Sequence, residues 1–165
     1  MALTLNEIAS GDEKSVICGT IMRTLPNWFG NEAAIAGYAR DVRDMPFFAA
    51  FVDAGEAIVF DYGDAIGFAA LKIHNEYTAE VCVMGVLQSY HRQGVGKMLI
   101  ERCVEECRRA GRLFLTVKTL DESSGSRSYA KTRLFYHAMG FRPLEVFPLY
   151  WDADNPCLLM AMYLG

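Results

Sequence analysis

The clearest hydrophobic pattern lies in the middle of the chain. Residues 81–87 are apolar with one glycine among them, as in a buried strand, and residues 88–93 are polar. From Gly94 to Ala110 the apolar side chains recur at helical spacing, and Gly111 follows where a helix commonly ends. The pattern predicts a central strand over Thr78–Leu87, then a turn, then an amphipathic helix.

The chain after this helix alternates once more between strand and helix. Leu113–Val117 is an apolar strand candidate, so strand, helix and strand make one right-handed crossover with parallel pairing. A Gly- and Ser-rich loop over 119–128 precedes a helix over Tyr129–Met139. The apolar tail can end in a strand only beyond Pro156. Three side chains of the helix over Tyr129–Met139 are expected to face inward: Leu134, Phe135 and Ala138.

The N-terminal part is predicted to hold a short edge strand at Leu3–Leu5 and two helices. The first helix runs from Asp12, its expected cap, to Leu25, where a proline stops it. The second helix begins after Asn31, which is a good cap, and continues to about Arg43.

An antiparallel meander is predicted between these helices and the central strand. Residues 45–56 are ambiguous, because the apolar run Met45–Val52 fits either a buried strand or a short helix. Ala57–Tyr62 and Ala65–His74 are strand candidates, and Gly63-Asp64 between them suits a hairpin turn. These two strands and the central strand would be the three strands of the meander.

Composition is typical of a soluble globular protein. With 165 residues, one domain spanning 1–165 is the default, and a chain of this size can bury a core. The net charge of −4 argues against nucleic acid as the main partner. No apolar run reaches the roughly 18 residues of a membrane span. The N-terminus lacks a charged-then-apolar signal pattern, so we expect a cytoplasmic protein.

The five cysteines contain no C-x-x-C pair. They are expected to be free, mostly buried thiols in a reducing compartment. Cys103 and Cys107 stand four residues apart on the apolar face of the central helix, with no His or Cys to join them. We therefore expect no metal site.

The junction between the central strand and its helix favours binding of an anion. The N–H groups of the first helical turn have no acceptor inside the helix, and the macrodipole adds roughly half a positive charge. The glycines of Gly94-Val95-Gly96-Lys97 let a ligand approach the backbone. A phosphate or pyrophosphate is the expected occupant.

Two motifs resemble those of the GNAT superfamily of N-acetyltransferases. Leu25-Pro26-Asn27-Trp28-Phe29-Gly30, together with Trp151 and Asn155-Pro156-Cys157, resembles a little-characterised bacterial subgroup. Met84-Gly85-Val86 stands in the place of the family's Leu-x-Val strand end, and residues 91–96 in that of its Gln/Arg-x-x-Gly-x-Gly/Ala loop. Residues 136–141, Tyr-His-Ala-Met-Gly-Phe, match Tyr-x-x-x-Gly-Phe. The resemblance covers most of the chain. It implies an α/β (α+β) GNAT acyl-CoA N-acyltransferase fold, with a mixed, mostly antiparallel sheet flanked by helices and strands splayed at the cofactor site.

The resemblance implies acetyl-CoA as the donor. The loop's backbone N–H groups would hold the pyrophosphate, and the pantetheine arm would add like a strand near Met84–Val86. His91 stands where Gln or Arg is usual, and because the grip is largely by backbone we expect binding to survive. The residues assigned to the cofactor are Met84, Gly85, Val86, His91, Arg92, Gln93, Gly94, Val95, Gly96, Lys97, Arg133 and Tyr136.

The family resemblance also implies direct attack of an amine on the thioester through a tetrahedral intermediate. An unperturbed lysine-type amine has a pKa of about 10.4, so a base must take its proton. Glu80 is the first candidate, because it lies 14 residues before Gly94 (94 − 80), as the family's base glutamate does. The alternative for Glu80 is a solvated charge. His74 is the second candidate base or a structural histidine. Tyr136 matches the family's tyrosine beside the sulfur, which would protonate the thiolate or contact the thiol, and the alternative for it is a core tyrosine.

The acceptor side is less defined by the sequence. Trp28 and Phe29 fit either a hydrophobic staple at a helix joint or an apolar lip of a substrate pocket, which His74 would share. Arg133 faces either the phosphates or solvent. The favoured function is acetylation of a primary amine of a small molecule or protein, by a monomer or homodimer. The alternative is a non-catalytic acyl-CoA-binding sensor, which would need neither Glu80 nor the tyrosine.

Overall fold

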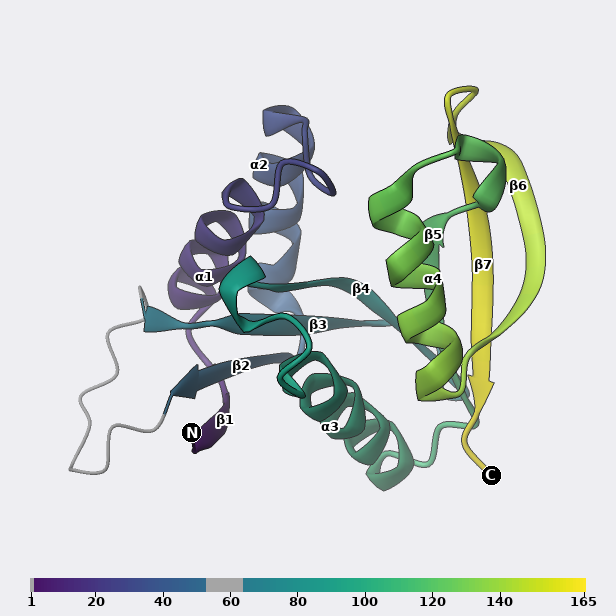
Figure 1. Cartoon of the computed structure of the whole chain (residues 1–165). Coiled ribbons are helices and arrows are strands. Elements are labelled where there is room, and N and C mark those ends of the chain that lie inside the picture. Colours follow the sequence, from purple (N-terminus) through teal and green to yellow (C-terminus); the bar gives the residue numbers. More distant parts are fainter. Residues whose placement is uncertain (1, 53–63) are drawn as a thin grey trace. The chain divides into compact units, whose positions relative to one another are not determined.

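The computed structural model describes residues 2–52 and 64–165, whose elements are labelled in Figure 1. The strands form a seven-stranded sheet in the order β1-β2-β3-β4-β5-β7-β6. The pairs β1–β2, β2–β3, β5–β7 and β6–β7 are antiparallel, and β4–β5 is parallel. The predicted α/β fold, a mixed and mostly antiparallel sheet flanked by helices, is confirmed.

The described residues fall into two compact units. One unit consists of Met1–Lys72 and Val83–Cys103, and the other of Ile73–Cys82 and Val104–Gly165. The single domain expected over the whole chain stays a prediction. Within the described ranges, no helix is long and apolar enough to cross a membrane.

The first unit begins with β1 (Leu3–Glu7), which is an edge strand, as predicted. The helix α1 (Gly11–Arg23) is capped by Ser10, whose Oγ accepts a hydrogen bond from the Glu13 N–H at 3.4 Å. The expectation that Asp12 is the cap was wrong. Asp12 lies inside the first turn, where its negative charge complements the helix dipole.

The second helix begins where the sequence predicts. Asn31 caps α2 (Glu32–Asp41), and its Oδ1 accepts hydrogen bonds from the N–H groups of Ala33 and Ala34. The helical path continues as the short 3-10 helix η1 (Val42–Asp44), so its end lies close to the predicted one.

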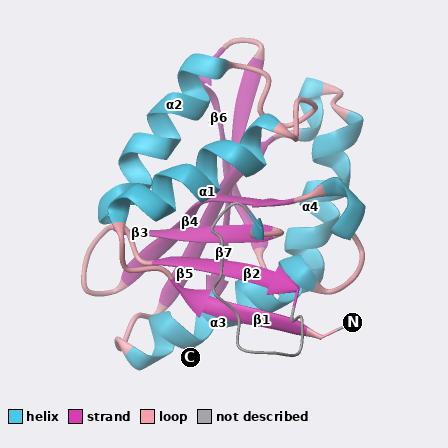
Figure 2. Cartoon of the chain, turned by 90° about the vertical axis from the view of Figure 1, so that its left-hand side faces the viewer, coloured by secondary structure: helices cyan, strands magenta, loops and turns pink. Residues whose placement is uncertain are grey.

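The ambiguous segment is a strand. β2 (Phe47–Val52) pairs with β1 and with β3 (Gly67–Ile73), and Figure 2 shows β1 and β2 side by side. The first five side chains of β2 are all buried, so both faces are covered and the sequence has no alternation that separates a strand from a helix. The predicted strand Ala57–Tyr62 and Gly63 of the predicted turn lie outside the described residues.

The core of the first unit joins α1 and α2 to β2 and β3. Phe47 and Phe68 are fully buried and stack with 5.3 Å between ring centroids. Gly85 in β4 (Thr78–Val86) is closely covered, because a Cβ there would lie 3.1 Å from Ile21 and 3.2 Å from Phe68. The glycine therefore lets α1 and β3 pack tightly against the end of β4.

The helix α3 (Val95–Arg109) has the predicted amphipathic character. Gly94 and Gly111 flank it, and both have a positive φ, of 85° and 76°. Side chains at helical spacing form its buried face, and Ile100 adds to the predicted set. The buried residues are Val95, Leu99, Ile100, Cys103 and Cys107.

The second unit contains most of the C-terminal part of the chain. The predicted polar loop is shorter than expected, because β5 extends to Leu120 and α4 begins directly after Ser126, whose Oγ accepts from the Tyr129 N–H at 3.3 Å. β7 lies between β5 and β6, and Pro156 is its second residue, near the strand start, where proline is tolerated. The elements are β5 (Phe114–Leu120), η4 (Glu122–Ser124), α4 (Arg127–Met139), β6 (Arg142–Asp152) and β7 (Asn155–Tyr163).

The inward face of α4 differs from the predicted one. Leu134 is 72% exposed and Ala138 is exposed as well, so both predictions were wrong. Tyr136 is buried instead, 5.5 Å from Phe141 between ring centroids and tilted against Phe135, which is half-buried. An aromatic ring buries more apolar surface than a leucine, so the aromatic contacts set the rotation of this helix.

Candidate functional site

The loop between β4 and α3 combines a short helical turn with two left-handed residues. η3 (Gln88–Tyr90) follows the strand, and Arg92 and Gly94 have φ angles of 61° and 85°. The left-handed conformation costs a residue with a Cβ about 1–2 kcal/mol, so Arg92 is strained and Gly94 is not. The Met98 N–H donates to the Gly94 carbonyl at 3.0 Å, so α3 starts directly after this glycine.

Two side chains of this loop fold back onto its own backbone. The His91 Nε2–H donates to the Val86 carbonyl at 2.7 Å, because a carbonyl oxygen can only accept. The Gln93 amide donates to the Ser89 carbonyl at 2.8 Å. These bonds hold the loop against the end of β4 and use the two side chains for structure.

The start of α3 fits a diphosphate. A Cβ on Gly94 would have no neighbour within 4 Å, so the space above this residue is open. The first-turn N–H groups of Val95, Gly96 and Lys97 have no acceptor inside the helix and carry the positive end of its dipole. The Lys97 ammonium lies 3.7 Å from Glu101 in an exposed pair, which is weak enough to release the cation to a ligand.

The two aromatics of the turn after α1 lie in the same unit as this loop. Trp28 and Phe29 are partly buried and pack against the core. The N–H groups of both donate to the Leu25 carbonyl, and the Trp28 ring meets the His91 ring edge-on at 5.6 Å. Trp28 therefore contacts the loop between β4 and α3 through His91.

A partly buried ionic cluster in the second unit contains both candidate bases. One carboxylate oxygen of Glu80, Oε1, lies 2.7 Å from His74 Nε2 and 2.6 Å from Lys118 Nζ. The Glu80 side chain is only 7% exposed, against 32% for His74 and 19% for Lys118. Glu80, the first candidate base, is thus held in a close pairing with Lys118 that the sequence did not indicate.

The hydrogen-bonded pairing of β4 with β5 ends at Glu80. The parallel pairing of β4 with β5 covers Thr78–Glu80 and Phe114–Thr116, and the pair Glu80–Thr116 is the last one in the described residues. Both strands continue beyond it, β4 to Val86 and β5 to Leu120. Strands that stop pairing leave backbone N–H and C=O groups to which an extended amide-bearing ligand can bind.

The other charged and titratable neighbours of this cluster come from the following strands. Burial lowers the pKa of Lys118, but the hydrogen bond and charge of Glu80, with Tyr150 and Cys157, outweigh it and raise the pKa above the usual 10.5. The Tyr150 ring centre is 5.4 Å from Lys118 Nζ. Burial raises the pKa of the Cys157 thiol, although Lys118 opposes this effect. The lysine is therefore charged at neutral pH.

Two further predicted site residues lie on α4. Tyr136 is buried among aromatic rings, as described above. Arg133 donates from Nη1 to the Leu120 carbonyl at 2.7 Å, so it holds the end of β5. Asp121, the acid next to it, caps η4 by accepting from the Ser123 hydroxyl and N–H, and the hydroxyl is the main cause of its lowered pKa.

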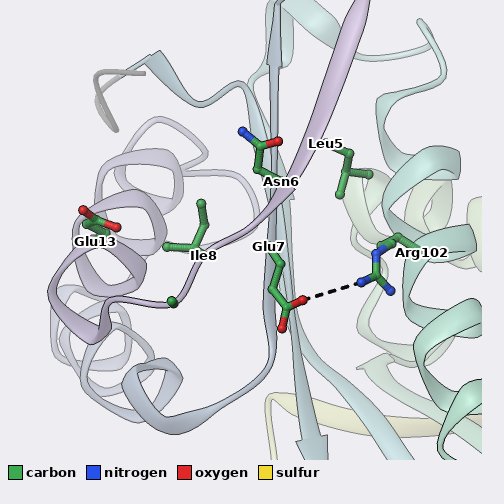
Figure 3. A pocket seen from close by; sticks show the side chains of 7 residues that line it. Leu5, Asn6, Glu7, Ile8, Glu13 and Arg102 are labelled. Carbon is green, nitrogen blue, oxygen red and sulfur yellow. Dashed lines mark ion pairs between the residues drawn. The ribbon is translucent and has the colours of Figure 1, made fainter. Parts of the chain in front are cut away.

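A separate hollow lies beside the edge strand β1. It has a volume of about 490 Å³, and Figure 3 shows Arg102 of α3 and Glu7 of β1 pointing toward each other within it. Their ion pair measures 3.7 Å, and the guanidinium lies 4.3 Å from the centre of the Phe48 ring. None of the predicted site residues lines this hollow.

The sequence matches a family model over a range that includes this loop and this cluster. The model of the Acetyltransferase (GNAT) domain matches residues 47–143, which is 97 of the 165 residues (143 − 47 + 1). The chain belongs to the GNAT family of acetyltransferases. It is therefore an N-acetyltransferase by family, and both the β4–α3 loop and Glu80 lie within the matched range. A search of curated proteins found no match.

Solved structures share the GNAT fold over nearly the whole chain. A protein described as a GNAT acetyltransferase from Desulfovibrio desulfuricans is 19% identical, with a TM-score of 0.79 over 99% of this chain and 100% of that one. The ribosomal-protein-S18-alanine N-acetyltransferase of Escherichia coli is 18% identical, with a TM-score of 0.70 over 99% and 95%. A GNAT acetyltransferase of Elizabethkingia anophelis, solved with acetyl-CoA bound, is 16% identical, with a TM-score of 0.69 over 98% and 97%. At these identities the likeness shows the fold alone.

Lys118 is the residue of this GNAT chain that sequence reasoning missed. It stands between Val117 and Thr119, both of which are buried, in the interior of β5. A lysine inside an apolar strand is rarely buried without a partner, and this was the signal available in the sequence. The identity of the partner depends on the parallel register with β4, which the sequence does not specify.

Proposed function

We propose that this GNAT chain transfers the acetyl group of acetyl-CoA to a primary amine of a small molecule or protein. The observation that carries the proposal is the loop before α3, which has open space above Gly94 and two side chains that hydrogen-bond back to the carbonyls of Val86 and Ser89. The acetyl-CoA bound in the Elizabethkingia anophelis relative supports the choice of donor.

Acetyl-CoA would supply an activated acetyl thioester. The backbone N–H groups of residues 93–97 would hold its diphosphate, and Lys97 would add a charge at its exposed position. The end of β4, Met84–Val86, would hydrogen-bond the amide-bearing arm as an added strand. His91 and Gln93 would act indirectly, by keeping the loop in its binding conformation.

The chemistry requires two proton transfers. The amine nitrogen attacks the thioester carbonyl carbon, a C–N bond forms and the C–S bond breaks. The amine proton passes to the pair of His74 and Glu80, which are hydrogen-bonded at 2.7 Å. The Tyr136 hydroxyl gives a proton to the departing thiolate and regains one from solvent.

A second candidate function rests on the pairing of Glu80. A buried carboxylate bonded to a lysine at 2.6 Å is also what a purely structural ion pair looks like. In that case the chain binds acyl-CoA without turning it over and acts as a sensor module. Thiol release from acetyl-CoA, measured against a panel of primary amines, distinguishes the two functions.

Two glycine variants at opposite ends of α3 test the donor site. Gly94→Ala and Gly111→Ala both place a Cβ at positive φ in open space, so the backbone penalty is the same kind in each. Only Gly94→Ala disturbs the first-turn N–H groups, and losing one charge-assisted hydrogen bond weakens binding by about tenfold to a hundredfold. Calorimetric titration with acetyl-CoA measures this. Equal affinities of the two variants would refute the assigned diphosphate site.

A further inference from the structure

The three members of the ionic cluster differ in how far solvent reaches them. Glu80 is almost completely enclosed, at 7% exposure, whereas the His74 side chain is 32% exposed. A general base must come within about 2.6–3.2 Å of the proton that it removes. Of the two hydrogen-bonded candidates, the imidazole is the one that an entering amine can reach.

The hydrogen bonds also determine which nitrogen of His74 can accept a proton. Lys118 donates to Glu80 Oε1 at 2.6 Å and carries a positive charge, which keeps the carboxylate ionised. An ionised carboxylate only accepts hydrogen bonds, so His74 Nε2 is the donor in the 2.7 Å contact. The lone pair of the neutral ring is then on Nδ1.

The hairpin between β3 and β4 holds this imidazole in place. The backbone N–H of His74 donates to the Thr78 carbonyl at 3.0 Å. Asn75 Oδ1 accepts from the N–H groups of Tyr77 and Thr78 at 2.8 and 2.9 Å, which fixes the turn. His74 therefore has an anchored backbone and a ring orientation set by Glu80.

We propose that His74 is the catalytic base and that Glu80 and Lys118 are positioning residues, an assignment that rests on the proposed acetyl transfer. The proton of the attacking amine passes to His74 Nδ1. Glu80 holds the ring in the Nε2–H tautomer and stabilises the imidazolium, and Lys118 holds the carboxylate. The imidazolium then returns its proton to water, for which the exposed part of the ring provides the route.

The charges around the ring predict the direction in which each variant shifts the pH dependence. The negative charge of Glu80 favours the imidazolium, and the positive charge of Lys118 opposes it. Tyr150 on β6 and Cys157 on β7 lie near Lys118, and burial raises the pKa of the Cys157 thiol. When the carboxylate charge is removed, the acidic limb of the pH profile of kcat/KM moves to lower pH. Without the lysine charge, it moves to higher pH.

The experiment compares His74→Gln, Glu80→Gln and Lys118→Met, each with an exposed control of the same residue type: His137→Gln, Glu76→Gln and Lys131→Met. Acetyl transfer is followed over a range of pH with acetyl-CoA and the one amine of the panel that wild type consumes fastest. His74→Gln should lower kcat/KM by about a hundredfold to a thousandfold and abolish the acidic limb. Glu80→Gln should cost about tenfold to a hundredfold and keep the limb, displaced to lower pH.

The reverse pattern overturns the assignment. If Glu80→Gln abolishes the limb while His74→Gln retains it, the carboxylate itself is the base. NMR of the His74 ring is a readout without turnover: the Nε2–H tautomer should dominate in the wild type and lose population in Glu80→Gln, and an unchanged tautomer ratio refutes the coupling. If wild type binds acetyl-CoA but consumes no amine, the proposed function fails, and the assignment of His74 as a base fails with it.

Discussion

Breaking the ion pair between Glu80 and Lys118 should measurably destabilise the second unit. Removing one partner of a buried pair costs about 3–5 kcal/mol, because the other charge is left without compensation. The Lys118 side chain keeps 19% of its surface exposed, so water moderates the loss, and we expect about 2–3 kcal/mol for Glu80→Gln or Lys118→Met. The double variant leaves neither charge buried and should lose less than the sum, giving a coupling energy of about 2 kcal/mol.

Urea unfolding of the wild type, the two single variants and the double variant measures this coupling. For a chain of this length, a loss of about 2–3 kcal/mol also lowers Tm by about 4–12 °C. The exposed pair Arg23–Glu32, at 2.7 Å, is the matched control and should show a much smaller coupling. If the single losses at Glu80 and Lys118 add to within about 0.5 kcal/mol, the pair does not interact as the geometry requires.

Three further outcomes are expected. His91→Gln keeps a hydrogen-bond donor for the Val86 carbonyl at the end of β4 and should bind acetyl-CoA within about threefold of wild type. His91→Ala lacks this donor and should bind about tenfold more weakly. Titration calorimetry that finds equal affinities for the two variants would contradict this. Burial raises the pKa of the Cys107 and Cys157 thiols, so iodoacetamide near neutral pH should modify half-buried Cys82 first. Peptide mass spectrometry that shows equal labelling of the three cysteines would count against this order. The pKa of Lys118 is raised in the folded state, so the contribution of Lys118 to folding stability is complete below pH 10.5 and is lost above that value. The wild type should therefore lose stability above pH 10.5 more steeply than Lys118→Met. Parallel pH–stability curves of the two proteins would argue against the shift.

The sequence was most informative where one local pattern sufficed. The glycines at both ends of α3 and the apolar spacing between them predicted the helix to within one residue at each end. Asn31 marked the start of α2 by its side-chain chemistry alone. The loop before Val95 is predicted to be an anion site because such a function would depend on backbone geometry, and the positive φ of Gly94 agrees with the glycine that the sequence places there.

Local patterns failed where the outcome depended on packing between distant segments. β2 has buried side chains on both faces, so its sequence does not alternate. Leu134 faces outward because the aromatic contacts of Tyr136 decide the rotation of α4. The contact of Glu80 with Lys118 joins residues 38 positions apart through a parallel register, and neither residue type alone predicts it.

The far edge of the sheet has a consequence for solubility. β6 is the last strand in the order, and it exposes large apolar side chains along its length. Such a strand is a template for edge-to-edge aggregation with other chains. Pro143 and Pro148 have no N–H to offer, and the register with β7 is irregular between Pro143 and Glu145 and again after Phe147. Each of these two prolines removes one N–H donor from β6, so this apolar strand offers fewer backbone donors than a regular strand of its length.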